Sequence, residues 1–222
     1  MTRSRNEWQK HHALRAALLL AASLLGGCKI LTIEEDRALR EAQGSQFNAS
    51  RYVDEMWDSR ILPALAEKSV STAELEDALT TGLDRAGEKL ARRAGEGSAW
   101  TFVIEGDAVV NAVDATSRKG TVDLTLEGLS PGRVARLQIG PVVSGTAIRD
   151  ALPFVNFNDF TDQLAFASVG SALTQRSLHD LSPQLEKLRP GEGIRFRGVV
   201  NLRSSNEPLV ITPLSIQTRG AG

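Results

Sequence analysis

Few side chains in this chain have the type and spacing that catalysis requires. Ser177, His179 and Asp180 are close in sequence and are the residue types of a nucleophile, a base and an orienting acid. A working triad, however, needs the base between the other two groups in space, which neighbours along a chain seldom provide. His179 follows a predicted helix, where a cation interacts favourably with the helix dipole. We therefore expect no enzymatic activity. The alternative is a hydrolase that acts on a carbohydrate or an ester.

Metal and phosphate sites are not indicated either. No cluster of His, Cys, Asp and Glu has the spacing of a metal-binding motif. The run Pro-Gly-Glu-Gly at residues 190–193 leads into a predicted strand, and it lacks the Lys-Ser/Thr pair of a phosphate-binding loop. We expect no metal and no cofactor.

The most unusual segment is GPVVSGTAIRDALPFVNFNDFTDQ, residues 140–163. It interleaves aromatic and polar side chains at a predicted strand-to-helix junction, and such a mixture can line a small pocket. The candidate binding residues are Arg149, Asp150, Phe154, Phe157, Asn158, Asp159 and Gln163. The alternative is a structural role, in which Arg149 pairs with Asp150 and the phenylalanines cover the core. Both interpretations remain open at this point.

Cys28 is the only cysteine, and the residues before it resemble a lipoprotein leader. A basic start is followed by the apolar run AALLLAASLL at residues 16–25 and then by Leu-Gly-Gly-Cys. This order is typical of a secretory signal, and the run is shorter than the about 20 apolar residues that cross a bilayer. L-G-G-C resembles the bacterial lipobox, which implies cleavage before Cys28 and attachment of lipid, including palmitate, to its sulfur.

The predicted organisation is a signal peptide at residues 1–27, a lipidated linker at 28–49, a helical hairpin at 50–95 and a strand-rich domain at 96–219. The protein is expected in the cell envelope, facing the periplasm. Lys29 after the cleavage point favours the outer membrane in a Gram-negative cell. From Cys28 onward the chain has 22 basic and 26 acidic residues. This mildly acidic charge argues against nucleic acid as a partner.

Residues 50–95 carry apolar side chains at spacings of three and four, which predicts two helices. Pro63 predicts a kink or break near Leu62. Ser71 and Glu74 form a capping-box pattern that begins the second helix, and Gly95 is expected to end it. We expect these two helices to pair as an antiparallel hairpin and to pack on a sheet.

After residue 97 the apolar period changes from about 3.6 to 2, which predicts strands near 100–105, 121–127, 134–139, 193–201 and 209–218. A helix at about 160–177, capped by Asn158 or Asp159, separates the third strand from the fourth. The expected fold class is α+β, with the helical hairpin packed on a small five-stranded OB-like β-barrel. A generic α+β sandwich is the alternative.

In an OB-like barrel, ligands bind on the exposed sheet face and on two hairpin loops. Those loops correspond here to residues 116–120, with the basic pair Arg118 and Lys119, and to residues 204–208. A solvated turn is the simpler interpretation of each.

Several segments together resemble DUF2291, a family of predicted periplasmic lipoproteins of unknown function. The resemblance lies in the lipobox, the run YVDEMW at 52–57, the stretch 139–160, the run FRG at 196–198 and the run ITP at 211–213. It implies a membrane-anchored, non-enzymatic lipoprotein that is an accessory or binding component of a sugar or polyol ABC import system. The expected partners are the membrane, through lipid on Cys28, and transporter components or a small sugar or polyol. The alternative remains an envelope hydrolase.

Overall fold

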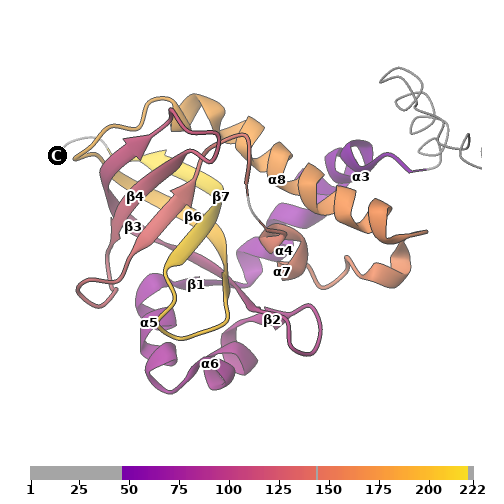
Figure 1. Ribbon diagram of the computed structural model, residues 1–222, viewed down its shortest axis with the longest axis horizontal. Helices are drawn as coiled ribbons and strands as arrows, with labels where there is room; N and C mark the ends of the chain where they lie inside the picture. Colours follow the sequence, from indigo (N-terminus) through magenta and orange to yellow (C-terminus); the bar gives the residue numbers. More distant parts are fainter. Residues whose placement is uncertain (1–46, 144, 220–222) are drawn as a thin grey trace, which may run out of the picture. The chain divides into compact units, whose positions relative to one another are not determined.

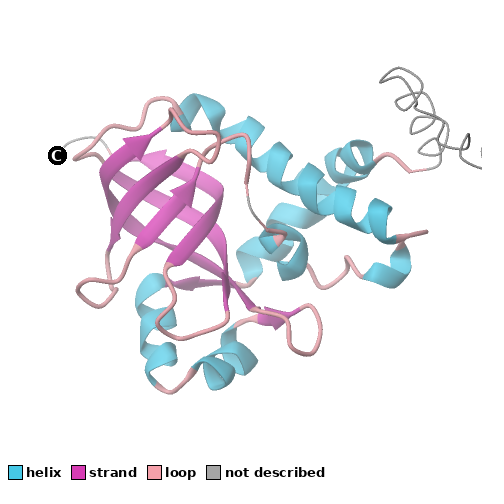
Figure 2. Ribbon diagram, in the orientation of Figure 1, coloured by secondary structure: helices cyan, strands magenta, loops and turns pink. Residues whose placement is uncertain are grey.

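The computed structural model describes residues 47–143 and 145–219, and these residues belong to one compact unit that begins at Phe47. The unit is an α+β fold in which one strongly curved sheet is flanked by helices (Figures 1 and 2). Cys28, Lys29 and the predicted signal peptide lie outside the described residues. Within the described ranges, no helix is both long enough and apolar enough to cross a bilayer.

Seven strands in the described residues form the sheet. They are β1 (Ser69–Ser71), β2 (Arg92–Arg93), β3 (Trp100–Asp114), β4 (Thr121–Leu126), β5 (Ala135–Gln138), β6 (Gly193–Leu202) and β7 (Leu209–Thr218). The long strand β3 pairs antiparallel with β4 on one side and with β6 on the other. β4 pairs with β5, β5 runs parallel to β7, and β7 pairs with β6. These pairings close a ring of five strands, and β1 and β2 add to β3.

The first predicted helix consists of three consecutive pieces, α3 (Ala49–Met56), the π-helix η1 (Trp57–Ile61) and α4 (Leu62–Glu67). The Asn48 side chain begins it by accepting a hydrogen bond from the Arg51 N–H at 2.9 Å. Pro63 does not break the helix, because it lies in the first turn of α4, where its missing N–H costs little. The irregularity instead lies just before it, as the π-helical turn.

The second predicted helix is two helices, α5 (Thr72–Thr80) and α6 (Leu83–Leu90). The predicted N-terminus is confirmed, because the Ser71 side chain accepts from the Glu74 N–H at 3.1 Å. The chain then breaks at Gly82, whose φ of 106° is a conformation that side chains other than glycine rarely adopt. The predicted end at Gly95 is wrong, since α6 ends at Leu90 and the short strand β2 follows.

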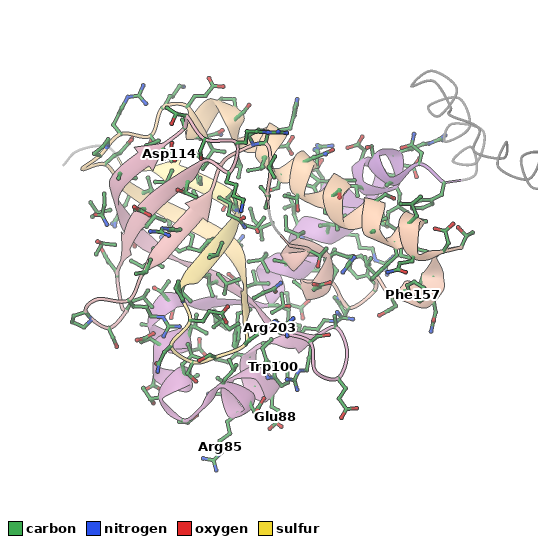
Figure 3. The ribbon with its side chains drawn as sticks, in the orientation of Figure 1. Arg85, Glu88, Trp100, Asp114, Phe157 and Arg203 are labelled. Atoms are coloured by element: carbon green, nitrogen blue, oxygen red, sulfur yellow. The ribbon has the colours of Figure 1, made fainter. Side chains whose placement is uncertain are left out.

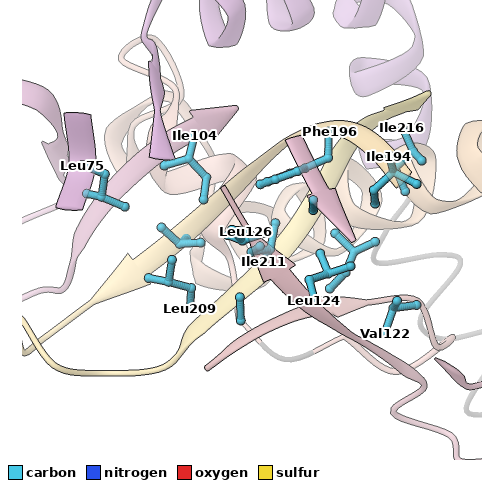
Figure 4. Packing of buried hydrophobic residues seen from close by; sticks show 14 of the residues in the cluster. Leu75, Ile104, Val122, Leu124, Leu126, Ile194, Phe196, Leu209, Ile211 and Ile216 are labelled. Carbon is cyan, nitrogen blue, oxygen red and sulfur yellow. The ribbon is translucent and has the colours of Figure 1, made fainter. Parts of the chain in front are cut away.

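The predicted antiparallel hairpin of these helices is also wrong, because they pack into two different hydrophobic cores. The first core lies inside the ring of strands and is covered by α5, α6 and the end of the long helix α8 (Gln163–Leu185) (Figure 4). The second core lies between α3, η1, α4, the short helix α7 (Ala147–Ala151) and the start of α8. Val103, Val199 and Leu214 of the sheet face this second core. Helix α8 therefore joins the two cores, and the sheet separates them.

Helix α8 begins later and ends later than the predicted helix at 160–177. Its N-cap is Asp162, whose carboxylate accepts from the Ala165 N–H at 2.8 Å, and not the predicted Asn158 or Asp159. Those two residues belong to a short 3-10 helix, η2 (Phe157–Asp159), that precedes it. Asp162 prevails because it directly precedes the first helical residue, where a side-chain acceptor can satisfy a free N–H.

Candidate functional site

The structure gives Arg149 and Asp150, on α7, a structural role. The Arg149 guanidinium donates to Asp150 Oδ1 through Nε at 3.0 Å and Nη2 at 2.8 Å, and its carbon lies 3.9 Å from the centre of the Phe166 ring. Thr146 Oγ1 donates to the other carboxylate oxygen of Asp150 at 2.6 Å. The two side chains are only 13% and 14% exposed. This closed pair fastens α7 to α8.

The other five predicted binding residues lie on the surface or against neighbouring side chains. Asp159 accepts from the Asn156 N–H at 3.1 Å and so closes the turn of η2. Asn158 and Gln163 are exposed on the surface. Phe157 and Phe154 contact other side chains: the Phe157 ring meets the Phe166 ring edge-on at 5.6 Å, and the Phe154 ring lies 3.9 Å below the Arg60 guanidinium. None of the seven predicted residues lines the cavities described below.

Ser177, His179 and Asp180 do not form a catalytic arrangement. Ser177 is buried and its hydroxyl donates to the carbonyl of Pro213. The His179 side chain is 87% exposed, with Nδ1 3.6 Å from Asp180 Oδ1. Asp180 is in turn bound by Arg176 at 3.0 Å. The base therefore does not stand between the hydroxyl and the acid.

The two candidate loops lie at opposite ends of β3, because Asp114 at its end pairs with Thr121 whereas Trp100 at its start pairs with Leu202. In the first loop, hydrogen bonds from the Thr116 hydroxyl and N–H hold the pKa of Asp114 below its usual value. Arg118 and Lys119 are exposed there. The second loop is clamped by Arg133, which donates to two of its carbonyl groups. The loops therefore do not meet in one site.

Three of the cavities that the described residues form have volumes of about 590, 470 and 380 Å³. The largest of these three, which we call the groove, is lined by residues in or next to α4, β1, α6, β2, α7 and β3, and Figure 1 shows where these elements lie. It is lined by Glu67, Lys68, Ser69, Val70, Glu88, Lys89, Leu90, Ala91, Arg92, Thr101, Val103, Ala151 and Pro153. Its volume is in the range of small-ligand sites.

Four charged side chains of the groove have no charged or hydrogen-bonded partner among the described residues. Glu67, Lys68, Glu88 and Lys89 form no ion pair and no side-chain hydrogen bond with any other described residue. Figure 3 shows Glu88 on the outer side of α6. These two carboxylates and two ammonium groups place acceptors and donors around one opening.

Arg92, on β2, is by contrast held in place. Its Nη1 donates to the carbonyl of Asp150 at 2.7 Å, and its Nη2 donates to Asn156 Oδ1 at 3.2 Å. The guanidinium therefore joins β2 to the segment that contains the predicted binding residues. Through Arg92, Ala151 and Pro153, that segment forms one wall of the groove.

The C-terminal ends of three helices also line the groove. Glu67 is the last residue of α4, Leu90 the last of α6 and Ala151 the last of α7. The last carbonyl groups of a helix have no intrahelical donors, and at the end of α7 one of them, the carbonyl of Asp150, accepts from Arg92. Val70, Leu90 and Val103 add apolar surface. The groove combines dense hydrogen-bonding capacity with apolar area.

A family model described as "predicted periplasmic lipoprotein (DUF2291)" matches residues 18–217. The chain belongs to the DUF2291 family. As a member of this family it is a predicted periplasmic lipoprotein of the cell envelope, and the family has no established function. No curated protein matches the chain.

This DUF2291 chain is also similar in structure to an OB-fold protein from Thermotoga maritima, solved by crystallography at 1.90 Å. The similarity has a TM-score of 0.62 at 18% sequence identity and covers 78% of this chain and 99% of that chain. It shows that the DUF2291 chain has an α+β fold related to the OB fold. At this identity it carries no inference about a ligand.

Sequence reasoning missed the groove of this DUF2291 chain. The available signal was the charged pairs Glu67-Lys68 and Glu88-Lys89, which each lie at the end of an apolar helical stripe. A charged helix end is usually a solvated one, however, and the two pairs lie 21 positions apart in the sequence. Among the described residues, no group of three or more His, Cys, Asp and Glu could hold a metal ion.

Proposed function

We propose that this protein is a non-enzymatic lipoprotein of the cell envelope that binds a small neutral polyhydroxy compound, a sugar or a polyol, in the groove. It is anchored to the membrane by lipid on Cys28 and serves as an accessory or binding component of a sugar or polyol ABC import system. The observation that carries the proposal is the set of unpaired carboxylates and ammonium groups around one opening. We take the ring of β3, β4, β5, β7 and β6 as the predicted OB-like barrel that supports this site.

The chemistry of the groove favours a neutral ligand with many hydroxyl groups. Each hydroxyl both donates and accepts a hydrogen bond, so it can use Glu67 and Glu88 as acceptors and Lys68 and Lys89 as donors at once. The two signs of charge balance between these four side chains, so they do not select a strongly charged ligand. The apolar surface of Val70 suits the C–H faces of a sugar ring.

The envelope location supports the anchoring part of the proposal. Family membership identifies a predicted periplasmic lipoprotein, and Cys28 follows the leader pattern in the sequence. Lys29 supports transfer to the outer membrane if the cell is Gram-negative. Cys28→Ala is expected to abolish incorporation of labelled palmitate and to leave the precursor uncut. Equal labelling of the wild type and this variant would contradict the anchor.

Thermal-shift titration of the purified protein with a panel of sugars and polyols tests the groove. A ligand that binds only the folded state raises the melting temperature as its concentration rises above Kd. Glu88→Gln should raise the Kd, because it removes one charged acceptor from the opening. The matched control is Glu96→Gln, an exposed carboxylate that does not line the groove. A panel with no shift, or equal effects of the two variants, would contradict the proposed site.

The link to an importer has a separate test. The lipidated protein, isolated from its native membrane with a mild detergent, is expected to retain components of a sugar or polyol ABC transporter. Cys28→Ala serves as the control, because it removes the lipid through which the protein is proposed to be anchored. Recovery of no transporter component above that control would contradict the accessory role and would leave solute binding to be judged by the titration.

A further inference from the structure

Five aromatic rings form a continuous cluster at one end of the compact unit. Phe47, Tyr52 and Phe160 contact one another with ring centres 5.4–5.7 Å apart. Phe160 contacts Phe166 at 5.6 Å, and Phe166 contacts Phe157 edge-on at 5.6 Å. We call this cluster, together with Leu164, the aromatic end; Figure 3 labels Phe157 there.

The aromatic end contains the two most exposed large hydrophobic side chains of the described residues. Leu164 is 79% exposed and Phe157 is 51% exposed. The other exposed large hydrophobic side chains among the described residues are four valines, which are 40–46% exposed. Both are held firmly: Leu164 lies in the first turn of α8, which Asp162 caps, and Phe157 stands against the Phe166 ring. A fixed, exposed apolar surface of this kind marks an interaction site.

The chain itself indicates what this surface meets. Phe47 is the first described residue and lies 19 positions after Cys28. A fully extended chain spans at most about 3.3–3.6 Å per residue, so the separation is at most about 68 Å. Because Phe47 belongs to the aromatic end, this end is where the compact unit is tied to the lipid. We propose that the aromatic end docks on the bilayer that holds the lipid on Cys28, with Phe157 and Leu164 inserted at the interface.

The chemistry of the surrounding residues agrees with a lipid surface. Aromatic side chains are favoured at the level of the lipid headgroups. Arg60 is exposed, stacks on Phe154 at 3.9 Å and forms no ion pair with any described residue, so its guanidinium can bind a lipid phosphate. Asp159 and Asp162 are engaged by the backbone: Asp159 accepts from the Asn156 N–H and Asp162 accepts from the Ala165 N–H.

Tryptophan substitution and quenching by labelled lipid test this inference, which rests on the proposed anchor at Cys28. The full lipidated protein is reconstituted into vesicles of phosphatidylethanolamine and phosphatidylglycerol, with or without bromine-labelled phosphatidylcholine. Leu164→Trp and Phe157→Trp place the probe in the aromatic end. Val210→Trp is the matched control, because Val210 is 46% exposed and lies on β7, outside the cluster. The parent protein gives the background of its own tryptophans.

The added tryptophans at 164 and 157 are expected to lose emission in the bromine-labelled vesicles and to emit at shorter wavelength, whereas the one at 210 keeps its emission. Equal behaviour of the three positions would overturn docking. Equal quenching at the three positions is also the result expected if the aromatic end binds a protein partner and not the bilayer, because the vesicles contain no other protein. Flotation of the vesicles separates the two proposals: protein that floats without quenching refutes docking only, and protein that does not float refutes the anchor and docking together.

Discussion

Trp57 provides the most direct test of the second hydrophobic core. Its side chain is 2% exposed, in the π-helical turn between α3 and α4. A large aromatic side chain buries about 150–250 Å², which at about 25 cal/mol per Å² corresponds to about 4–6 kcal/mol. The unfolded chain already buries part of this area, so that figure is an upper value. We expect Trp57→Ala to lower the free energy of unfolding by about 3–5 kcal/mol.

The assay is urea unfolding followed by far-ultraviolet circular dichroism, because removal of an indole also changes the fluorescence signal. The matched control is Leu164→Ala, a truncation at a site 79% exposed, which should change the free energy of unfolding by no more than about 0.5 kcal/mol. A loss below about 1 kcal/mol for Trp57→Ala would refute the reasoning, because it would mean that α3, η1 and α4 contribute little to the folded unit.

Two further predictions concern the sheet and its covering helices. A Cβ atom at Gly87 of α6 would overlap the indole ring of Trp100, so Gly87→Ala should destabilise the protein by about 1–3 kcal/mol in urea unfolding. Adding Trp100→Leu to this variant should restore part of the lost stability. Unchanged stability of Gly87→Ala would contradict this contact. Hydrogen bonds from Arg197, at 2.5 and 2.9 Å, lower the pKa of Glu105. The ionised carboxylate therefore stabilises the folded state at pH values above its unfolded pKa. This contribution to stability is lost as the pH falls through the folded pKa. Glu105→Gln should therefore flatten the fall in stability on the acid side of about pH 4.3. The change should be modest, because the two side chains of the pair are about one-third exposed. A pH profile of stability that matches the wild type would contradict the linkage.

Alternation predicted the five longer strands, but β3 extends to Asp114, beyond the predicted 100–105, and the short strands β1 and β2 were not predicted. Val122, Leu124 and Leu126 are buried, and Thr125 between them is exposed, as a period of two requires. Helix ends were less predictable, since several residues compete for each cap. The capping-box pattern identifies Ser71 as a cap, whereas Asp162 lies close to other polar residues from which the sequence does not distinguish it.

The sequence did not predict the groove, because the contacts that a charged side chain makes cannot be read from its position in the sequence. Arg149 and Asp150 drew attention as charged residues in an apolar segment, but they satisfy each other, and the aromatic ring of Phe166 covers the guanidinium. Lys68 and Lys89 are unremarkable in the sequence. They become neighbours of one opening only because β1 and β2 both add to the same strand, β3.

By itself the sequence determined the leader pattern at Cys28, the family, the α+β class and the order of strands around α8, because these depend on local composition and period. Only the tertiary structure decided that the two helical segments enter separate cores, that the sheet closes into a ring, and that three helix ends meet at the groove. Such outcomes depend on which surfaces bury one another across long sequence separations. A pattern of apolar residues indicates that one face of a helix or strand is buried, but it does not indicate which other element that face packs against.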